Sequence, residues 1–430
     1  MLASFPQVLS KVAQPSDLRY PSLITSKQGE KRTPIREHPN QRVWGSSYSS
    51  WESGQGSAHL ALDVCQFNKN LKLICCANTF QQYFQHDLAF FTEISVGSPP
   101  QIQQVLVDIS SPQTFVTASN CTRCCMGGTR YNSFDSSTFR VREPNVAYSS
   151  PWMDVHGALS EDVMSLGPLS IKDQAFMDGD TVAPVGVGYD DLCLVHGVLG
   201  LTLSDDGSSM HTPSPFMTIA ASGILDANIF SLRLRWPYEL SFGRLNPLHY
   251  KGNITYVPVT NKTSPYGLTG RWQTSAKSLS IDPLGLYYSL ENLTASFSTA
   301  TAFMYLPDAM VVDLLDKLEF EWLPMMPPSL LCASREFLPD ITFNLAGQNF
   351  TLTPYDYTLL WKTDEHGVRC VSAIYPINLD PSTNVEIMLG SAFLRAFYSV
   401  FDLDQMTVGC TLFPVLCSGY KLMSLVAPLS

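Results

Sequence analysis

The chain has 430 residues, 45% of them hydrophobic and 15% charged, with a formal net charge of -11 at pH 7. A single hydrophobic core seldom grows beyond about 250 to 300 residues, so this length predicts two lobes or two domains. The negative charge, without any Lys/Arg run, argues against a nucleic-acid partner or an anionic membrane surface. No apolar run approaches the roughly 18 residues that a membrane-spanning helix needs.

Residues 1–88 differ in composition from the rest of the chain. They are rich in Ser, Gln, Pro and Lys, and they show no sustained helical or strand periodicity. A signal peptide is not visible, because Lys11, Asp17 and Arg19 interrupt any apolar core near the start. The composition therefore predicts a poorly ordered N-terminal extension over residues 1–88.

From Phe90 onward the chain consists of short runs of alternating apolar and β-branched residues, separated by Gly/Pro turns. Phe91–Val96 and Gln104–Val107 are two such runs, and the pattern is typical of strands in an all-β protein. The best helix candidate is 307–317, where a proline precedes apolar residues spaced three to four apart. We expect a mainly β fold with a few short helices.

A series of motifs resembles the pepsin family of aspartic proteases. Phe91–Gln101, followed by Val105–Ser111, resembles the entry to that family's first catalytic loop, which there reads Asp-Thr-Gly-Ser. Further matches follow in the family's order and at plausible spacing, among them residues 197–201, 239–243, 256–259, 338–343 and 398–402. The resemblance covers roughly residues 90 to 412.

This resemblance implies a bilobal pepsin-like fold, with an N-terminal β lobe over 89–258, a C-terminal β lobe over 259–418 and a tail at 419–430. It implies a cleft between the lobes for a peptide or protein ligand, with one catalytic loop from each lobe. We expect a monomer without a cofactor. No metal is expected either, because the eight histidines and eleven cysteines show no ligand spacing. Since fold alone does not establish activity, the loops must be considered separately.

The family's chemistry needs two carboxylates that share one proton, so that one acts as base and the other as acid. Asp108, at the end of an apolar strand, occupies the first position. Ser298 occupies the second, followed by a Tyr-Leu-Pro sequel that resembles the family's pattern. An alcohol neither shares a proton at acidic pH nor serves as a matched acid. The sequence therefore predicts an incomplete catalytic dyad.

Three neighbouring positions also depart from the family pattern. Ile109 replaces the Thr or Ser whose hydroxyl braces the two loops in the family, and Ser110 and Ala300 replace glycines that allow close backbone approach. Our main hypothesis is a non-catalytic homologue that retains peptide binding. The alternative is an active or weak aspartic endopeptidase working at acidic pH. A serine hydrolase is disfavoured, because there is no Gly-x-Ser-x-Gly motif and Ser298 has no histidine partner by motif.

The family covers its cleft with a hairpin, the flap, that carries a tyrosine. Val146–Tyr148 resembles the strand with this tyrosine, and Gly157 the turn residue beyond it. Tyr148 is thus expected to close over a ligand. The alternative is an aromatic side chain on a surface strand.

The eleven cysteines are an odd number, so at least one stays unpaired in a monomer. Cys121 with Cys124, and Cys332 with Cys370, look like one disulfide per lobe; the alternative is buried free thiols. Asn-x-Thr glycosylation sequons occur at Asn120, Asn253, Asn261, Asn292 and Asn349. They favour a secreted protein or one of the secretory or vacuolar pathway, although no signal peptide is visible.

Overall fold

The computed structural model describes residues 56–64, 89–122, 129–149, 153–184, 197–203, 212–235, 238–260, 270–323, 326–363, 367–377 and 386–413. Within these ranges strands predominate and the helices are short. The predicted tail at 419–430 and most of the predicted extension at 1–88 lie outside the described residues.

The N-terminal sheet places the first loop. Its order is β2 (Asp63–Val64), β3 (Phe90–Val96), β4 (Gln101–Asp108), β9 (Gly197–Gly200), β5 (Phe115–Thr117), β8 (Leu169–Pro184), β7 (Met153–Leu166) and β6 (Arg140–Ser149). Most neighbours are antiparallel, but β4 and β9 run parallel, with Asp108 opposite Gly200. This parallel pair brings two segments far apart in the sequence to the same end of the sheet.

The C-terminal sheet repeats this arrangement. Its order is β19 (Gln348–Leu352), β18 (Ile341–Leu345), β13 (Gln273–Ile281), β15 (Thr294–Phe297), β23 (Glu386–Leu389), β16 (Met304–Pro307) and β22 (Ile374–Ile377), and β14 (Leu286–Ser289) also pairs with β13. Here β15 and β23 run parallel, with Phe297 opposite Leu389. The corresponding parallel pairs confirm the predicted mainly β, bilobal pepsin-like fold.

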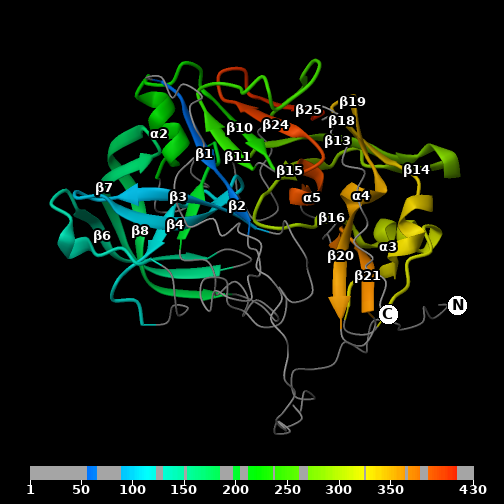
Figure 1. The fold of residues 1–430 in the computed structure, drawn as a ribbon, viewed down its shortest axis with the longest axis horizontal. Helices are drawn as coiled ribbons and strands as arrows, with labels where there is room; N and C mark the ends of the chain where they lie inside the picture. The colour runs from blue at the N-terminus through cyan, green and yellow to red at the C-terminus, as the bar shows by residue number, and fades with distance from the viewer. Residues whose placement is uncertain are drawn as a thin grey trace, which may run out of the picture. The chain divides into compact units, whose positions relative to one another are not determined.

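A third sheet, the central sheet, joins strands from both halves of the chain. Its order is β1 (Ala58–Ala61), β11 (Glu239–Phe242), β10 (Ile229–Arg233), β24 (Tyr398–Asp402), β25 (Thr407–Thr411) and β12 (Thr255–Pro258), and Figure 1 shows β1, β11, β10 and β24 together. Phe230 stacks on Phe401 with ring centroids 4.6 Å apart, and Trp272 meets both rings edge-on. The main core therefore runs through this sheet from one half of the chain to the other.

Strands β1 and β2 correct the prediction that residues 1–88 form a poorly ordered extension. Strand β1 pairs with β11 over four residues, from Ala58 opposite Phe242 to Ala61 opposite Glu239. Ala58 and Leu60 are buried in the core. A four-residue strand completes too few alternations to give a periodic signal, which is why composition misjudged this segment.

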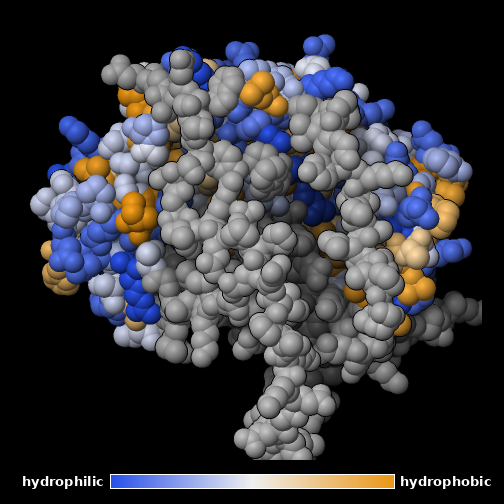
Figure 2. Space-filling model, in the orientation of Figure 1, coloured by the Kyte–Doolittle hydropathy of each residue, from blue (hydrophilic) through white to orange (hydrophobic). Residues whose placement is uncertain are grey.

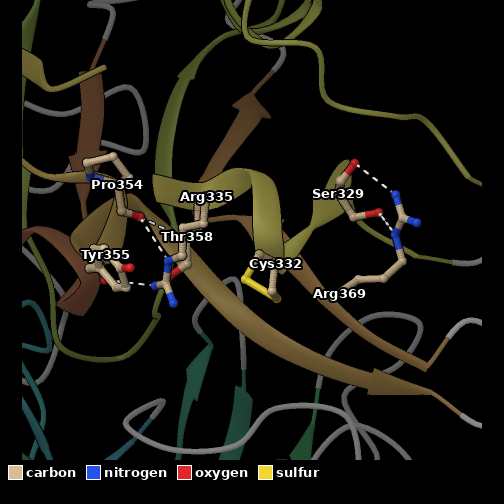
Figure 3. The surroundings of a disulfide bond; sticks show 8 residues. Ser329, Cys332, Arg335, Pro354, Tyr355, Thr358 and Arg369 are labelled. Atoms are coloured by element: carbon tan, nitrogen blue, oxygen red, sulfur yellow. Dashed lines mark hydrogen bonds between the residues drawn. A yellow bond between two sulfur atoms is a disulfide. The ribbon is translucent and has the colours of Figure 1, made fainter. Parts of the chain in front are cut away.

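A small sheet of β17 (Ser329–Leu331), β21 (Gly367–Ser372) and β20 (Thr358–Thr363) carries a disulfide. The predicted bond between Cys332 and Cys370 is present, with Cα atoms 5.0 Å apart. Figure 3 shows Arg335 beside it, donating to the carbonyl oxygens of Tyr355 and Thr358 at 3.1 and 2.8 Å. The disulfide thus joins the sheet to the short 3-10 helix Cys332–Phe337.

The helices are few and short in the described part of the chain. They are α2 (Pro215–Ala221), α3 (Asp308–Lys317), α4 (Pro354–Tyr357) and α5 (Ser391–Leu394), with 3-10 turns at Ser133–Asp135 and Asp282–Leu284. The helix predicted at 307–317 is confirmed as α3, which buries Val311, Leu314 and Leu315. None of the described helices has the length and apolar character needed to cross a membrane.

On the coloured part of the face in Figure 2, hydrophobic residues lie in small groups among hydrophilic ones. Isolated exposed apolar side chains, such as Phe134 and Phe337, are normal on protein surfaces. This part of the surface therefore identifies no partner.

Candidate active site

Two loops meet at the ends of the parallel strand pairs: the first loop, residues 108–111 after β4, and the second loop, residues 298–301 after β15. Leu201 N–H donates to the carbonyl oxygen of Asp108 at 3.0 Å, and Ser298 N–H donates to that of Leu389 at 3.1 Å. Each loop is thus fixed by backbone hydrogen bonding to the strand beside it.

A glycine lies against each loop at equivalent positions. A Cβ atom on Gly200 would lie 2.7 Å from the carbonyl oxygens of Ser111 and Gln113, and one on Gly390 would lie 2.7 Å from that of Thr301. No side chain fits at either glycine without a shift of the backbone. Gly390 follows Gly200 by the same 190 residues that separate Ser298 from Asp108, as expected for two lobes related by an approximate two-fold axis.

A chain of hydrogen bonds joins the two loops. Ser110 contacts Asp108 Oδ1 through its backbone N–H at 2.8 Å and its hydroxyl at 2.6 Å. Ser110 Oγ also lies 3.0 Å from Ser298 Oγ, which accepts from Ala300 N–H at 3.2 Å. Asp108 is 8% exposed and Ser298 is 1% exposed. The structure therefore brings together four of the predicted site residues, at the junction of the loops.

Thr299 braces the loops from one side. Its hydroxyl donates to the carbonyl oxygen of Val107 at 2.6 Å and accepts from Ile109 N–H at 3.2 Å. The Ile109 side chain is fully buried in the main core and has no hydroxyl to return the contact. Sequence reasoning identified the change at Ile109 but missed Thr299. Thr299 could have been identified from its position directly after Ser298, where the family pattern has Ser or Thr.

The electrostatics of Asp108 reflect its burial. Removal from water raises the pKa of the Asp108 carboxyl, while the hydrogen bonds from Ser110 and the charge of Arg271 act in the opposite direction. Arg271 is itself 11% exposed and lies 3.2 Å from Glu386, which is 7% exposed. This buried ion pair was not predicted from the sequence.

The predicted flap corresponds to the hairpin of β6 and β7. Tyr148 lies on β6 opposite Val155 and packs against a small apolar cluster that includes Phe115 and Met177. The prediction that Gly157 is a turn residue is wrong, because Gly157 lies inside β7. A Cβ atom there would lie 2.1 Å from the carbonyl oxygen of Asp178 on β8, so the glycine permits close approach of two strands.

The remaining candidate residues lie away from the loops. Cys121 is disulfide-bonded, whereas Cys124, its predicted partner, lies outside the described residues, and Cys410 is a buried free thiol. Four predicted glycosylation sites are exposed, and Asn261 lies outside the described residues; the exposed ones are Asn120, Asn253, Asn292 and Asn349. In the described ranges no cluster of three or more His, Cys, Asp or Glu side chains is placed to hold a metal ion.

Comparison with known proteins shows which family the chain resembles along most of its length. A family model described as eukaryotic aspartyl protease matches residues 89–412. Vacuolar protease A of Aspergillus fumigatus is 30% identical over 329 residues, which cover 74% of this chain and 78% of the relative. Cathepsin D of Dictyostelium discoideum is 30% identical over 334 residues, which cover 75% of this chain and 83% of the relative.

Proposed function

Because the chain belongs to the eukaryotic aspartyl protease family over residues 89–412, we propose that it is a non-catalytic member that binds extended peptides without cleaving them. The observation that carries this proposal is the pairing at the junction of the loops. A carboxylate, Asp108, comes from the first loop, and a hydroxyl, Ser298, comes from the equivalent position of the second.

Peptide hydrolysis at such a junction needs a base that takes a proton from water and an acid that donates to the scissile carbonyl oxygen. Asp108 can act as one of these at a time. The hydroxyl of Ser298 cannot act as the other, because its proton affinity lies far from the acidic working range. A lone carboxylate therefore leaves one half of the reaction without a catalyst.

The surrounding contacts support the same conclusion. Ser110 Oγ lies within hydrogen-bonding distance of both Asp108 and Ser298, so a side-chain hydroxyl fills the point between the two loop positions. The hydroxyl brace at this point comes from Thr299 on the second loop and is not matched from the first loop, since Ile109 has no hydroxyl. Each difference weakens the positioning that catalysis needs.

The decisive experiment is digestion of acid-denatured globin by the purified chain, with and without pepstatin. We expect no cleavage above the background of a matched Asp108→Asn variant. Pepstatin-sensitive cleavage that the variant lacks would overturn the proposal.

The same assay tests the second candidate function, an active or weak aspartic endopeptidase. Two observations favour it: the pKa of Asp108 is raised, as for an acid that holds its proton, and Thr299 still braces the loops. Relatives from Arthroderma otae and Aspergillus fumigatus are also named vacuolar protease A. Slow, pepstatin-sensitive turnover with an acidic optimum would establish this alternative.

Peptide binding rests on features separate from the missing acid. Strand β6 and the apolar cluster against which Tyr148 packs support this proposal, because extended peptides add backbone hydrogen bonds and side-chain contacts at such surfaces. Calorimetric titration with extended hydrophobic peptides should give measurable heat, and Tyr148→Ala should weaken the affinity. Absence of binding across a diverse peptide library would leave only a scaffold role.

We also propose that the chain passes through the secretory or vacuolar pathway. The Cys332–Cys370 disulfide, the exposed sequons and the vacuolar relatives support this. Treatment of the cellular protein with an endoglycosidase should reduce its apparent mass. An unchanged mass, with reduced Cys332 and Cys370, would count against it.

A further inference from the structure

The hydrogen bonds around Asp108 fix the direction of the hydroxyl protons in the site. An ionised carboxylate only accepts, so the 2.6 Å contact to Asp108 Oδ1 requires the Ser110 hydroxyl to donate. The Ser110 hydroxyl has a single proton, which it donates to Asp108. In the 3.0 Å contact between the two serines, Ser298 must therefore donate to Ser110. Ala300 N–H donates to Ser298. The chain of donors thus runs from Ala300 through both serines to Asp108.

Because the hydroxyl protons point in this direction, the junction of the loops offers a ligand the Asp108 carboxylate as an acceptor but no hydroxyl as a donor. Both serine protons point along the chain, so a carbonyl oxygen of a ligand meets no free hydroxyl proton here. A carboxylate has about four lone-pair sites. The N–H and hydroxyl of Ser110 both donate to Oδ1, whereas the N–H of Ser111 acts on the carboxylate from close by and donates to the Asp108 backbone carbonyl oxygen at 3.4 Å. At least one acceptor site therefore remains for a ligand.

The charges nearby leave this acceptor negative. Arg271 is the cation that acts on Asp108, but its guanidinium is paired with Glu386 at 3.2 Å, and the two side chains are only 11% and 7% exposed. The three groups together carry one net negative charge when ionised. A buried charge without a partner is costly, so a ligand cation at Asp108 would offset that cost.

We propose that Asp108 binds the ammonium group of a lysine side chain in an extended peptide, so that the site selects basic peptides. This inference rests on the proposed peptide-binding function and adds the class of ligand. It assigns to Asp108 the role of a binding residue, with Ser110 and Ser298 orienting its carboxylate.

The test is a lysine scan. An extended peptide of norleucine and alanine is compared by calorimetry with versions that carry lysine at each successive position. One position should bind about tenfold more tightly, the gain expected of a hydrogen bond between charged groups. Acetylation of that lysine keeps an N–H donor but removes the charge, and it should abolish the gain.

Two variants assign the gain to Asp108. Asp108→Asn should remove it, whereas Asp282→Asn, which removes an exposed carboxylate from the 3-10 turn Asp282–Leu284, should leave it unchanged. Lowering the pH through the pKa of Asp108 should weaken binding of the lysine peptide and leave binding of the norleucine peptide unchanged. The other charged groups near Asp108 are Arg271 and Glu386.

The possible results separate the two proposals. Binding of the norleucine peptide without a gain at any lysine position would overturn the lysine preference and leave peptide binding intact. A gain that persists in Asp108→Asn would assign the ammonium to another residue and overturn the inference as well. Binding of none of the peptides would remove the proposed peptide binding together with this inference.

Discussion

Thr299 reaches from the second loop to Val107, the last residue before Asp108, and its hydroxyl donates to the Val107 carbonyl oxygen at 2.6 Å. The same hydroxyl accepts from Ile109 N–H at 3.2 Å. One side chain therefore fixes the backbone on both sides of Asp108. The Ile109 side chain has no hydroxyl to return such a contact, so Thr299 and the contact between Ser110 and Ser298 hold the two loops together.

Replacing Thr299 with valine should lower stability. Valine keeps the shape but leaves a buried carbonyl oxygen and a buried N–H without partners, which costs about 2 kcal/mol or more. Thermal unfolding should therefore begin at a lower temperature. Thr342→Val is the matched control, because its hydroxyl bonds to that of Thr351 on an exposed face. An equal effect of the two variants would contradict the special role of Thr299.

Ser298→Asp alone should not give a working protease. The new carboxylate would face the Ser110 hydroxyl, which already bonds to Asp108, and Ile109 would still leave the brace one-sided. Globin cleavage at acidic pH should stay at the level of the parent chain.

The comparison for this prediction is a chain in which both loops carry the family pattern, with Ile109→Thr, Ser110→Gly, Ser298→Asp and Ala300→Gly together. It should cleave globin at least about a hundredfold faster than the single variant, since positioning contributes strongly to catalysis. Robust turnover by the single variant would show that the surrounding contacts matter little.

Local sequence motifs were enough to predict much of the fold and the centre of the site. Asp108 ends a strand whose flanking residues match a known pattern, and Ser298 precedes a recognisable sequel, so both were located without knowledge of contacts. The structure places them one hydroxyl apart, through Ser110. Helix α3 was predicted because its ten residues are long enough to show a helical period.

The features that were missed depend on pairing between distant segments. Arg271 and Glu386 meet because β13, β15 and β23 lie side by side, and a sequence does not specify which strands pair or in which register. Gly157 was assigned to a turn because it resembles the turn residue beyond the family's flap tyrosine, whereas here it allows β7 to approach β8. Strand β1 was missed because its burial depends on β11, far along the chain.

Removing the Cys332–Cys370 disulfide should destabilise the C-terminal half. The bridge closes a loop with a sequence separation of 38 residues. Without it the unfolded chain gains conformational freedom, so the free energy of unfolding should fall by about 3 to 4 kcal/mol. The double variant Cys332→Ala/Cys370→Ala should unfold at a clearly lower temperature. Cys410→Ala, which removes a buried free thiol and no bridge, is the control. A larger loss in the control would contradict a stabilising role for the disulfide.

Asp178 on β8 should make the fold less stable as the pH rises toward neutral. Burial, with a smaller effect of Asp180, raises the pKa of Asp178 to about 7. Its Oδ1 atom is buried and has no hydrogen-bond partner within the described residues. The folded chain thus binds a proton here that the unfolded chain releases near pH 3.8, the ordinary value for this group. The contribution of Asp178 to the free energy of unfolding is therefore fully present below pH 3.8 and is lost as the pH rises through about 7.

Asp178→Asn is neutral at every pH, so it should be more stable than the parent at pH 7, by up to about 4 kcal/mol, and no more stable at pH 3. Thermal unfolding of both chains at pH 3, 5 and 7 measures this difference. Asp180→Asn is the matched control: it removes the neighbouring charge but leaves the buried carboxyl, so its gain at pH 7 should be smaller. A gain for Asp178→Asn that is the same at all three pH values would mean that the amide improves packing or hydrogen bonding, and that the ionisation of Asp178 does not limit stability.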